Sequence, residues 1–297
     1  MGRVLMAGRV HAWMPLSPCG PGCVRSVMPT VGRSRRTVRL LRTAAAVLSG
    51  LLTLPLLAVV RGRGRTVLVR RVFRTVLRAL GARLEVHGDA TFGVPGGDGP
   101  HRGALVVDNH VSWLDTVAVN AVCPMRSVAK REIASWPVVG TLASRAGTVY
   151  LDRERLRALP GTVAELAAAL RGGALVNACP EGTTWCGLGL GRFRPALFQA
   201  AIDGGVPVRP LVVRYRLADG TPTTWPAFVG DETLLDSVRR TAALRGLVVE
   251  VHVLPEIAPG RATDRRHLAA LAETAVRAAL PGATSDDVAH PVAELTA

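Results

Sequence analysis

The sequence predicts an α/β fold, a sheet flanked by helices, and three observations support this prediction. Four short apolar runs each end abruptly on polar residues, as buried strands do where they leave a sheet: 104–107, 127–129, 148–151 and 174–179. Helical stretches separate these runs, at 113–122, 132–144 and 155–171. A further strand at 247–254 and a closing helix at 263–280 follow. Strands joined by helices are normally parallel, so their carboxyl ends should share one sheet edge, where such sheets bind ligands.

The composition divides the chain of 297 residues, 48% of them apolar, into parts of different character. Residues 1–90 hold 16 arginines against Glu85 and Asp89, a balance of +14 in a net charge of +15. Such a cationic start suggests a nucleic acid or an anionic membrane surface as partner. We expect a disordered basic leader (1–32), membrane-associating helices (33–82), a globular domain (83–281) and a loose tail (282–297).

The run 43–60 is the first candidate for membrane association. It has 18 residues without a charge, but it contains Pro55. As a helix it would be about 27 Å long, which is borderline for a membrane span. Arginines flank both ends, so the positive-inside rule gives no orientation. Symmetric charge favours a segment that enters and leaves the membrane on one side.

The stretch 66–80 is the second candidate, an amphipathic helix with arginines at 70, 74 and 78 along one side. It could be a surface helix docked on its own domain, or an interfacial membrane helix whose arginines meet lipid phosphates. Its position beside the run 43–60 favours the membrane interpretation. Nucleic-acid binding is disfavoured, because the helix is strongly apolar and aromatic residues make up only 4% of the chain.

The polar corner after the first predicted strand carries His110 and, five residues later, Asp115. Positions five apart lie about 140° apart around a regular helix, so the two can meet only if His110 is in the turn and Asp115 in the first helical turn. His110 could then be a general base oriented by Asp115. Alternatively, Ser112-x-x-Asp115 is a helix-capping sequence and His110 is a hydrogen-bonded turn residue. These ten or so residues alone leave both interpretations open.

The residues that follow the other strands favour the catalytic interpretation. Lys130, Arg153 and Glu181 each come directly after a predicted strand. A parallel sheet would place them on the same edge as His110 and Asp115. A base–acid pair together with two cations at one sheet edge indicates a catalytic site.

Cysteine and histidine spacings do not indicate a metal site. The five cysteines are irregularly spaced, and Cys19-Gly-Pro-Gly-Cys23 lacks a second half that would complete a zinc site. We therefore interpret all five as reduced, unligated thiols of a cytosol-facing protein. The histidines other than His110 show no ligand spacing with one another or with acids, which disfavours a metal-dependent hydrolase.

Four ordered motifs resemble those of the glycerolipid acyltransferases of the lysophosphatidic acid acyltransferase type, over about residues 83–258. Asn109-His110-x4-Asp115 resembles the first motif and Gly147-Thr-Val-Tyr-Leu-Asp-Arg153 the second. Pro180-Glu181-Gly182-Thr183 resembles the third and Val206-Pro207-Val208-Arg209-Pro210 the fourth. The resemblance implies that 83–281 is an acyltransferase domain with a glycerolipid-acyltransferase-like sheet.

The resemblance also implies a reaction and roles in it. The enzyme would move a fatty acyl group from an acyl thioester to the free hydroxyl of lysophosphatidic acid, giving phosphatidic acid. It would need no cofactor and no metal, with acyl-CoA or acyl-carrier protein as co-substrate. His110 and Asp115 would be catalytic. The expected substrate-binding residues are Lys130 and Arg153 for the phosphate, Glu181 and Gly182 for the acceptor site, Pro207 for the acyl-donor channel, and also Gly147 and Thr183.

Two departures from the family's usual motifs leave the identity of the acceptor lipid open. Thr184, with Arg192-Phe193-x-x-Ala196, resembles a branch that includes lyso-ornithine-lipid acyltransferases. Where many members have Phe-Lys-x-Gly, this chain has Phe193-Arg194-Pro195-Ala196. The alternative acceptor is therefore lyso-ornithine lipid or another lysolipid. We expect anionic membrane lipids and not nucleic acid as partners, with the protein peripheral or monotopic on the cytoplasmic side of the cell membrane. A non-catalytic membrane adaptor is the rival from another class, although His110 and Asp115 are both intact.

Overall fold

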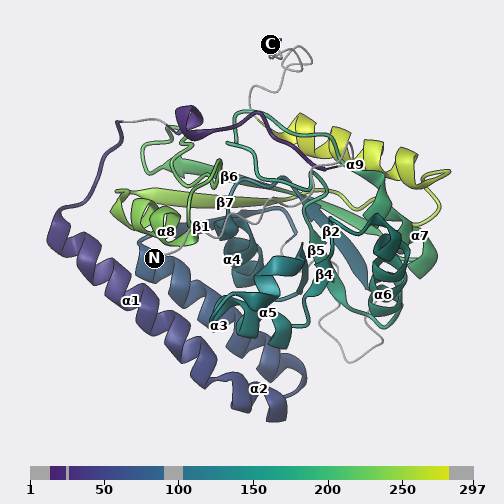
Figure 1. The fold of residues 1–297 in the computed structure, drawn as a ribbon, viewed down its shortest axis with the longest axis horizontal. Helices are drawn as coiled ribbons and strands as arrows, with labels where there is room; N and C mark the ends of the chain where they lie inside the picture. The colour runs from purple at the N-terminus through teal and green to yellow at the C-terminus, as the bar shows by residue number, and fades with distance from the viewer. Residues whose placement is uncertain (1–13, 25–26, 90–102, 281–297) are drawn as a thin grey trace.

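The computed structural model describes residues 14–24, 27–89 and 103–280, which contain a seven-stranded sheet flanked by helices (Figure 1). The strands stand in the order β1-β7-β6-β2-β5-β3-β4. Their bounds are β1 Arg83–His87, β2 Ala104–Asp108, β3 Arg126–Lys130, β4 Val149–Leu151, β5 Leu175–Ala178, β6 Val208–Leu217 and β7 Leu247–Val253. β6 and β7 are antiparallel, and the other neighbouring strands of the described part pair in parallel. The predicted α/β class and the four parallel strands are confirmed.

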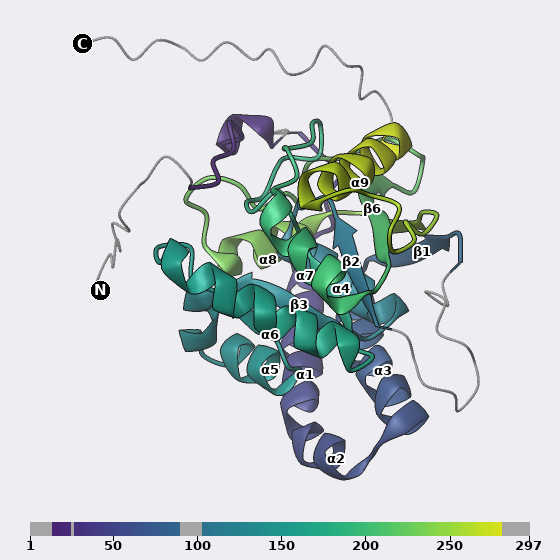
Figure 2. The same cartoon turned by 90° about the vertical axis from the view of Figure 1, so that its right-hand side faces the viewer.

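Helices cover both faces of this sheet (Figures 1 and 2). Their bounds are α1 Arg33–Leu52, α2 Leu54–Val59, α3 Gly62–Leu80, α4 Trp113–Val122, α5 Val139–Arg145, α6 Leu159–Arg171, α7 Phe198–Gly204, α8 Leu234–Ala243 and α9 Arg265–Ala279. Side chains alternate along β2, so Val106 joins one hydrophobic core with α3, α4 and α8. Leu105 and Val107 join a second core with α6, α7 and α9. The sheet is therefore buried on both faces around the carboxyl end of β2.

The prediction of a disordered leader over 1–32 is wrong for its described residues. Thr30 forms an antiparallel bridge with Leu244, and the Val31 amide donates to the carbonyl of Ala243 over 2.8 Å. The hydroxyl of Thr224 donates to the carbonyl of Cys23 over 2.8 Å. Residues 14–24 and 27–32 thus lie against the domain, held by backbone bonds that composition does not reveal. Residues 1–13 and 25–26 lie outside the described residues, as does the predicted tail 282–297.

The uncharged run 43–60 does not form one continuous helix. α1 ends at Leu52, and a new helix, α2, begins after Thr53 with Pro55 in its first turn. Proline lacks the amide hydrogen that a continuing helix needs, so the break falls where the sequence has its proline. Within the residues that the structure describes, no helix is long and apolar enough to cross a membrane.

α3, the helix at the stretch 66–80, has the carboxyl-terminal part of its apolar face covered by the domain. Val76, Leu77 and Leu80 are buried in the core shared with α4. The guanidinium of Arg74 donates to the carbonyl of Ala121 at the end of α4, over 2.9 Å. The carboxyl-terminal half of the helix is therefore docked on its own domain, whereas Val67 is 45% exposed, and a membrane interface for the helix stays a prediction. α1 and α4 both pack against the helix.

Two further differences concern element bounds. The helix predicted over 132–144 is a 3₁₀ helix at Arg131–Ser135 followed by α5, with Trp136 and Pro137 between them. A residue before proline is disfavoured in the helical region, which explains the interruption. The predicted strand 247–254 and closing helix 263–280 are confirmed as β7 and α9.

Candidate active site

The carboxyl ends of β2, β5, β3 and β4 lie along one edge of the sheet, because these strands are parallel neighbours. His110 and Glu181 follow β2 and β5, Lys130 ends β3, and Arg153 follows β4. The predicted convergence of these residues on one edge is therefore confirmed. Burial lowers the pKa of Arg153, and the nearby charge of Glu132 opposes that effect.

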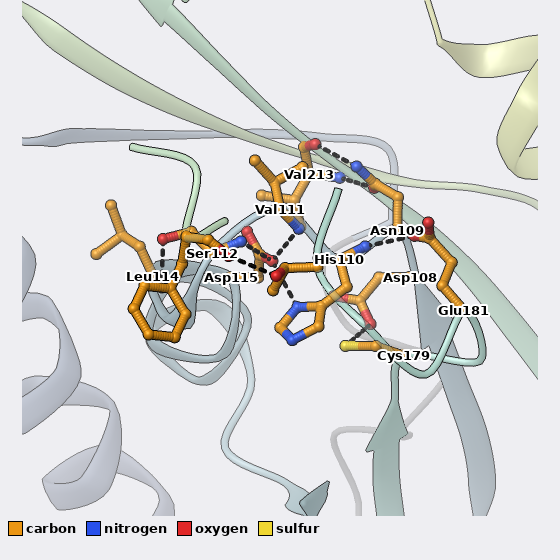
Figure 3. Close-up of polar contacts among 12 residues, drawn as sticks. Asp108, Asn109, His110, Val111, Ser112, Leu114, Asp115, Cys179, Glu181 and Val213 are labelled. Carbon is orange, nitrogen blue, oxygen red and sulfur yellow. Dashed lines mark hydrogen bonds and ion pairs between the residues drawn. The ribbon is translucent and has the colours of Figure 1, made fainter. Parts of the chain in front are cut away.

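His110 and Asp115 meet in the turn between β2 and α4 (Figure 3). Nδ1 of His110 lies 3.0 Å from Oδ2 of Asp115. Asp115 stands in the first turn of α4, where its carboxylate accepts from the amide of Ser112 over 2.8 Å. The Ser112 hydroxyl accepts from the Leu114 amide in return, which completes a capping box. The two interpretations of the motif are therefore both correct, since one carboxylate caps the helix and holds the imidazole.

The hydrogen bonds of the Asp115 carboxylate fix the tautomer of the imidazole. Oδ2 also accepts from the Val111 amide over 2.7 Å, and Oδ1 accepts from the hydroxyl of Tyr215. A carboxylate surrounded by donors acts only as an acceptor, so Nδ1 of His110 carries the proton and Nε2 keeps its lone pair. The side chain of Asp115 is 0% exposed and that of His110 is 24% exposed. The base is thus accessible, whereas its orienting acid is not.

Tyr215 is a site residue that the sequence did not indicate. It lies on β6, 100 residues from Asp115. Burial raises the pKa of Tyr215, and the charge of Asp115 raises it further, so the phenol stays neutral and donates. Nothing in the local pattern of an apolar strand distinguishes such a tyrosine from a core residue.

Glu181 holds the backbone of His110, which corrects the acceptor-binding role predicted for it. Its Oε1 accepts from the His110 amide over 2.7 Å, and its Oε2 accepts from the Gly191 amide over 2.8 Å. The residue is 3% exposed. Burial raises the pKa of Glu181, and the two amide donors oppose that effect. The carbonyl of His110 accepts from the Trp185 amide over 2.7 Å. The loop after β5 therefore bonds both the amide and the carbonyl of this histidine.

Asn109 fixes the same corner to β6. Its amide nitrogen donates to the Val213 carbonyl over 2.9 Å, and its carbonyl oxygen accepts from the Val213 amide over 2.8 Å. The side chain thereby takes the place of a strand partner, and it is 3% exposed. The position of His110 is therefore set by buried contacts to β6 and to the β5 loop.

Three of the remaining predicted substrate residues lie at this edge. Lys130 forms an exposed ion pair with Glu132, with Nζ and Oε1 2.9 Å apart. Gly182 and Thr183 lie on the loop after β5, and Gly182 has a φ of +77°. A Cβ at Gly182 would lie 3.0 Å from ring carbons of Pro15, so the N-terminal segment covers this turn. The binding roles of these residues stay predictions.

Gly147 and Pro207 lie away from His110, each just before a strand begins. Gly147 precedes β4 with a φ of +78° and lies beside Arg126, at the opposite end of the strand from Arg153. The carbonyl of Pro207 accepts from the Leu105 amide over 3.1 Å, at the start of β2. At about 3.3 Å per strand residue, this is roughly 10 Å from the end of β2. Both residues lie where the chain enters a strand, and their substrate-binding roles stay predictions.

Asp108 is a second buried carboxyl beside the catalytic pair, and the sequence did not single it out. Its Oδ1 accepts from the side-chain NH₂ group of Asn177 over 2.8 Å. The same oxygen lies 3.5 Å from the Cys179 sulfur (Figure 3). Its Oδ2 is buried without a hydrogen-bond partner among the described residues. Burial, and secondly the charge of Asp115, raises the pKa of Asp108 to about 7 from an ordinary value of 3.8.

We expect Asp108→Asn to stabilise the protein at neutral pH. The folded protein keeps the Asp108 proton up to about pH 7, whereas the unfolded chain loses it near pH 4. Stability therefore falls as pH rises through this window, by up to about 4 kcal/mol for a shift of this size. Melting temperatures measured at about pH 5 and about pH 8 should differ less in the variant than in the wild type. The exposed control Asp203→Asn should keep the wild-type difference, and an unchanged difference in Asp108→Asn would contradict the assignment.

The sequence is similar to those of known acyltransferases. The sequence model of a family described as Acyltransferase matches residues 83–214. The 1-acyl-sn-glycerol-3-phosphate acyltransferase of Neisseria meningitidis is 37% identical over 205 residues, covering 69% of this chain and 77% of that protein. The lyso-ornithine lipid O-acyltransferase of Pseudomonas aeruginosa is 38% identical over 191 residues, covering 63% and 71%.

A solved structure has the same fold. The crystal structure of the 1-acyl-sn-glycerophosphate (LPA) acyltransferase of Thermotoga maritima superposes with a TM-score of 0.61 at 18% identity, covering 83% of this chain and 94% of that one. Relatives of this identity, matched over more than two thirds of their own length, show the family. This chain belongs to the lysophospholipid acyltransferase family.

Proposed function

We propose that the protein transfers a fatty acyl group from an acyl thioester to the free hydroxyl of lysophosphatidic acid, giving phosphatidic acid. The observation that carries this proposal is the His110–Asp115 pair, whose accessible Nε2 faces away from Asp115 at a sheet edge that also holds Lys130 and Arg153 (Figure 3). A base with a fixed tautomer beside cations suits an anionic acceptor that carries a hydroxyl group.

The reaction requires one base and no covalent enzyme intermediate. The acceptor hydroxyl oxygen attacks the thioester carbonyl carbon as Nε2 of His110 removes the hydroxyl proton. The carbon–sulfur bond then breaks, and the thiolate leaves with the proton returned from the imidazolium. Asp115 stabilises the imidazolium in between, because its buried carboxylate bonds Nδ1 directly.

The acceptor's phosphate is best assigned to the cations of β3 and β4. Arg153 is partly buried at the site edge, and its guanidinium can hold a phosphate by two parallel bonds. Lys130 ends the neighbouring strand and can add a point charge if its exposed ion pair with Glu132 opens.

Arg153→Lys should raise the KM for lysophosphatidic acid about tenfold, since one bond of a charged pair is lost. The KM for the acyl thioester should change much less, because the acyl carbonyl reacts at His110. Steady-state kinetics with each substrate varied in turn would measure both effects. The exposed Arg157→Lys serves as control, and a rise confined to the thioester KM would contradict the phosphate assignment.

Lyso-ornithine lipid is the second candidate acceptor, because relatives of both names resemble the chain to about the same degree. The test uses the purified full-length protein with labelled acyl-CoA, and separately with acylated carrier protein, against a panel of lysolipids. Fastest transfer to lysophosphatidic acid supports the main proposal. Fastest transfer to lyso-ornithine lipid replaces it by the second, and transfer to neither lipid overturns both.

We further propose that the protein is peripheral or monotopic on the cytoplasmic side of the cell membrane, bound through α1 and α2. Large apolar side chains are exposed there, among them Leu52 (73%), Leu56 (50%) and Val59 (78%). α2 lies at the end of the helical layer farthest from the sheet (Figure 1). Exposed arginines follow directly, at positions 61, 63 and 65, where they could meet anionic lipids.

Changing Leu52, Leu56 and Val59 together to Gln should weaken binding to both anionic and neutral vesicles, since their burial in lipid would be lost. Changing the arginines at 61, 63 and 65 to Gln should weaken binding to anionic vesicles only, by about 1 kcal/mol per arginine. Vesicle sedimentation at low and high salt separates the two contributions. Leu235→Gln, on α8 and 54% exposed, is the matched control. Wild-type binding by the apolar triple variant would rule out this surface.

A further inference from the structure

Three cysteines that are scattered in the sequence meet in the structure. The sulfur atoms of Cys19, Cys23 and Cys186 all lie within 4.8 Å of one another. Cys19 and Cys23 belong to the N-terminal segment, around a 3₁₀ helix at Pro21–Cys23, whereas Cys186 lies in the loop between β5 and α7. No third ligand follows the N-terminal pair at a regular spacing in the sequence, but the fold brings Cys186 to it.

The surroundings of these sulfurs favour negative charge. The Cys186 amide donates to Sγ of Cys19 over 3.3 Å, and the Leu188 amide bonds the Cys186 sulfur. Backbone amides directed at sulfur are the usual outer-shell support of metal-bound thiolates.

We propose that Cys19, Cys23 and Cys186 bind one zinc ion as thiolates, with the fourth position left for water. Thiolates select soft or borderline cations such as Zn²⁺ over Mg²⁺ or Ca²⁺. Tetrahedral zinc with bonds of about 2.3 Å places its sulfurs about 3.7 Å apart, so the cluster needs to contract by about 1 Å at most. Cys186 is 5% exposed and Cys19 and Cys23 are half-buried, so the ion would be enclosed between segment and loop.

The other group of potential ligands in the described chain is less suited. The rings of His87 and His252 stack with centroids 4.4 Å apart at the β1–β7 pair, a proximity that sequence spacing does not show. Glu250, their potential partner, is already bonded to Arg216 over 2.5 Å. A cation there would lie beside the guanidinium of Arg216, which bonds the other oxygen of the same carboxylate, so the two positive charges would repel each other.

The zinc would act on the active site through the loop after β5. Trp185, which precedes Cys186, donates its amide to the His110 carbonyl, and Gly191 of the same loop bonds Glu181. The ion would join this loop to the N-terminal segment, which covers Gly182 through Pro15. Its role is therefore structural, fastening two distant parts of the chain that together support the histidine.

Elemental analysis of the full-length protein, purified with a reductant and without chelator, tests the proposal. We expect about one zinc per chain, as for a tight structural site. Cys186→Ser should lose most of it, and Cys123→Ala, a buried cysteine outside the cluster, should retain it. Replacement by Co²⁺ should give the near-ultraviolet absorption of thiolate–cobalt bonds in the wild type and not in Cys186→Ser.

A second measurement covers the case in which Cys186→Ser does not fold. Zinc added to the wild type should protect Cys19, Cys23 and Cys186 from alkylation, as read by mass spectrometry of peptides, while the labelling of Cys179 stays unchanged. Equal labelling of the three cysteines with and without zinc overturns the proposal. So does a zinc-free protein whose intact mass is lower by that of two hydrogens, because the cluster would then be a disulfide.

Discussion

His110→Ala is expected to lower the turnover of acyl transfer by about 10²–10⁴-fold, the usual cost of losing a general base. The protein should still fold, because the bonds that fix the corner use the backbone of His110 and not its ring. The amide bond to Glu181 and the carbonyl bond from Trp185 both survive the substitution. Turnover at saturating lysolipid and thioester, measured beside circular dichroism and vesicle binding, separates chemistry from folding.

A histidine outside the site gives the control for this experiment. His267→Ala removes an exposed imidazole at the start of α9 and should leave turnover unchanged. Near-normal turnover in a folded His110→Ala protein would remove His110 from the mechanism.

Asp115→Asn should damage stability and turnover together. Its carboxylate accepts from the Val111 and Ser112 amides, from Nδ1 of His110 and from the Tyr215 hydroxyl. An amide offers one acceptor oxygen and turns its NH₂ group toward buried donors, which should cost about 2–4 kcal/mol of unfolding free energy. The imidazole would also lose its tautomer, so turnover should fall by about 10²–10⁴-fold.

Tyr215→Phe separates the two effects of the aspartate. It removes one donor but leaves the carboxylate bonded to Nδ1, so it should cost about 1.5–3 kcal/mol of stability with a much smaller loss of turnover. Denaturant unfolding and kcat would be measured on both variants. Full turnover by Asp115→Asn would show that the imidazole needs no orienting acid.

The part of the fold that could be predicted is the part where apolar residues change to polar ones within a few positions of the sequence. Strands β2 to β5 are short, apolar and followed at once by polar residues, so their ends could be predicted to within two residues. The same contrast placed His110 in a turn and Asp115 in a first helical turn, which the structure confirms. Because strands joined by helices are normally parallel, the order of the elements was then enough to predict which strand ends lie at the same edge of the sheet.

What the sequence could not predict depends on partners distant in the chain. The apolar stripe of α3 has the same pattern whether lipid or protein covers it, and only the fold shows that α1 and α4 pack against it. A glutamate in a Pro-Glu-Gly turn can face substrate or accept backbone amides, and Glu181 does the latter. The meeting of Cys19 with Cys186 spans 167 residues, beyond any motif window.

The bonds that hold His110 in position have a consequence for how the enzyme discriminates between lysolipids of different acyl-chain length. The backbone bonds of His110 to Glu181 and Trp185, and the bond of its ring Nδ1 to Asp115, form when the protein folds, before any substrate arrives. The entropy lost in ordering the base is therefore part of the folding free energy and not of the activation free energy. A lysolipid with a shortened chain would bind more weakly, yet once bound it would meet a base already in position. Selection among acceptors of different length in this enzyme should therefore be exerted through affinity, with turnover nearly constant along the series.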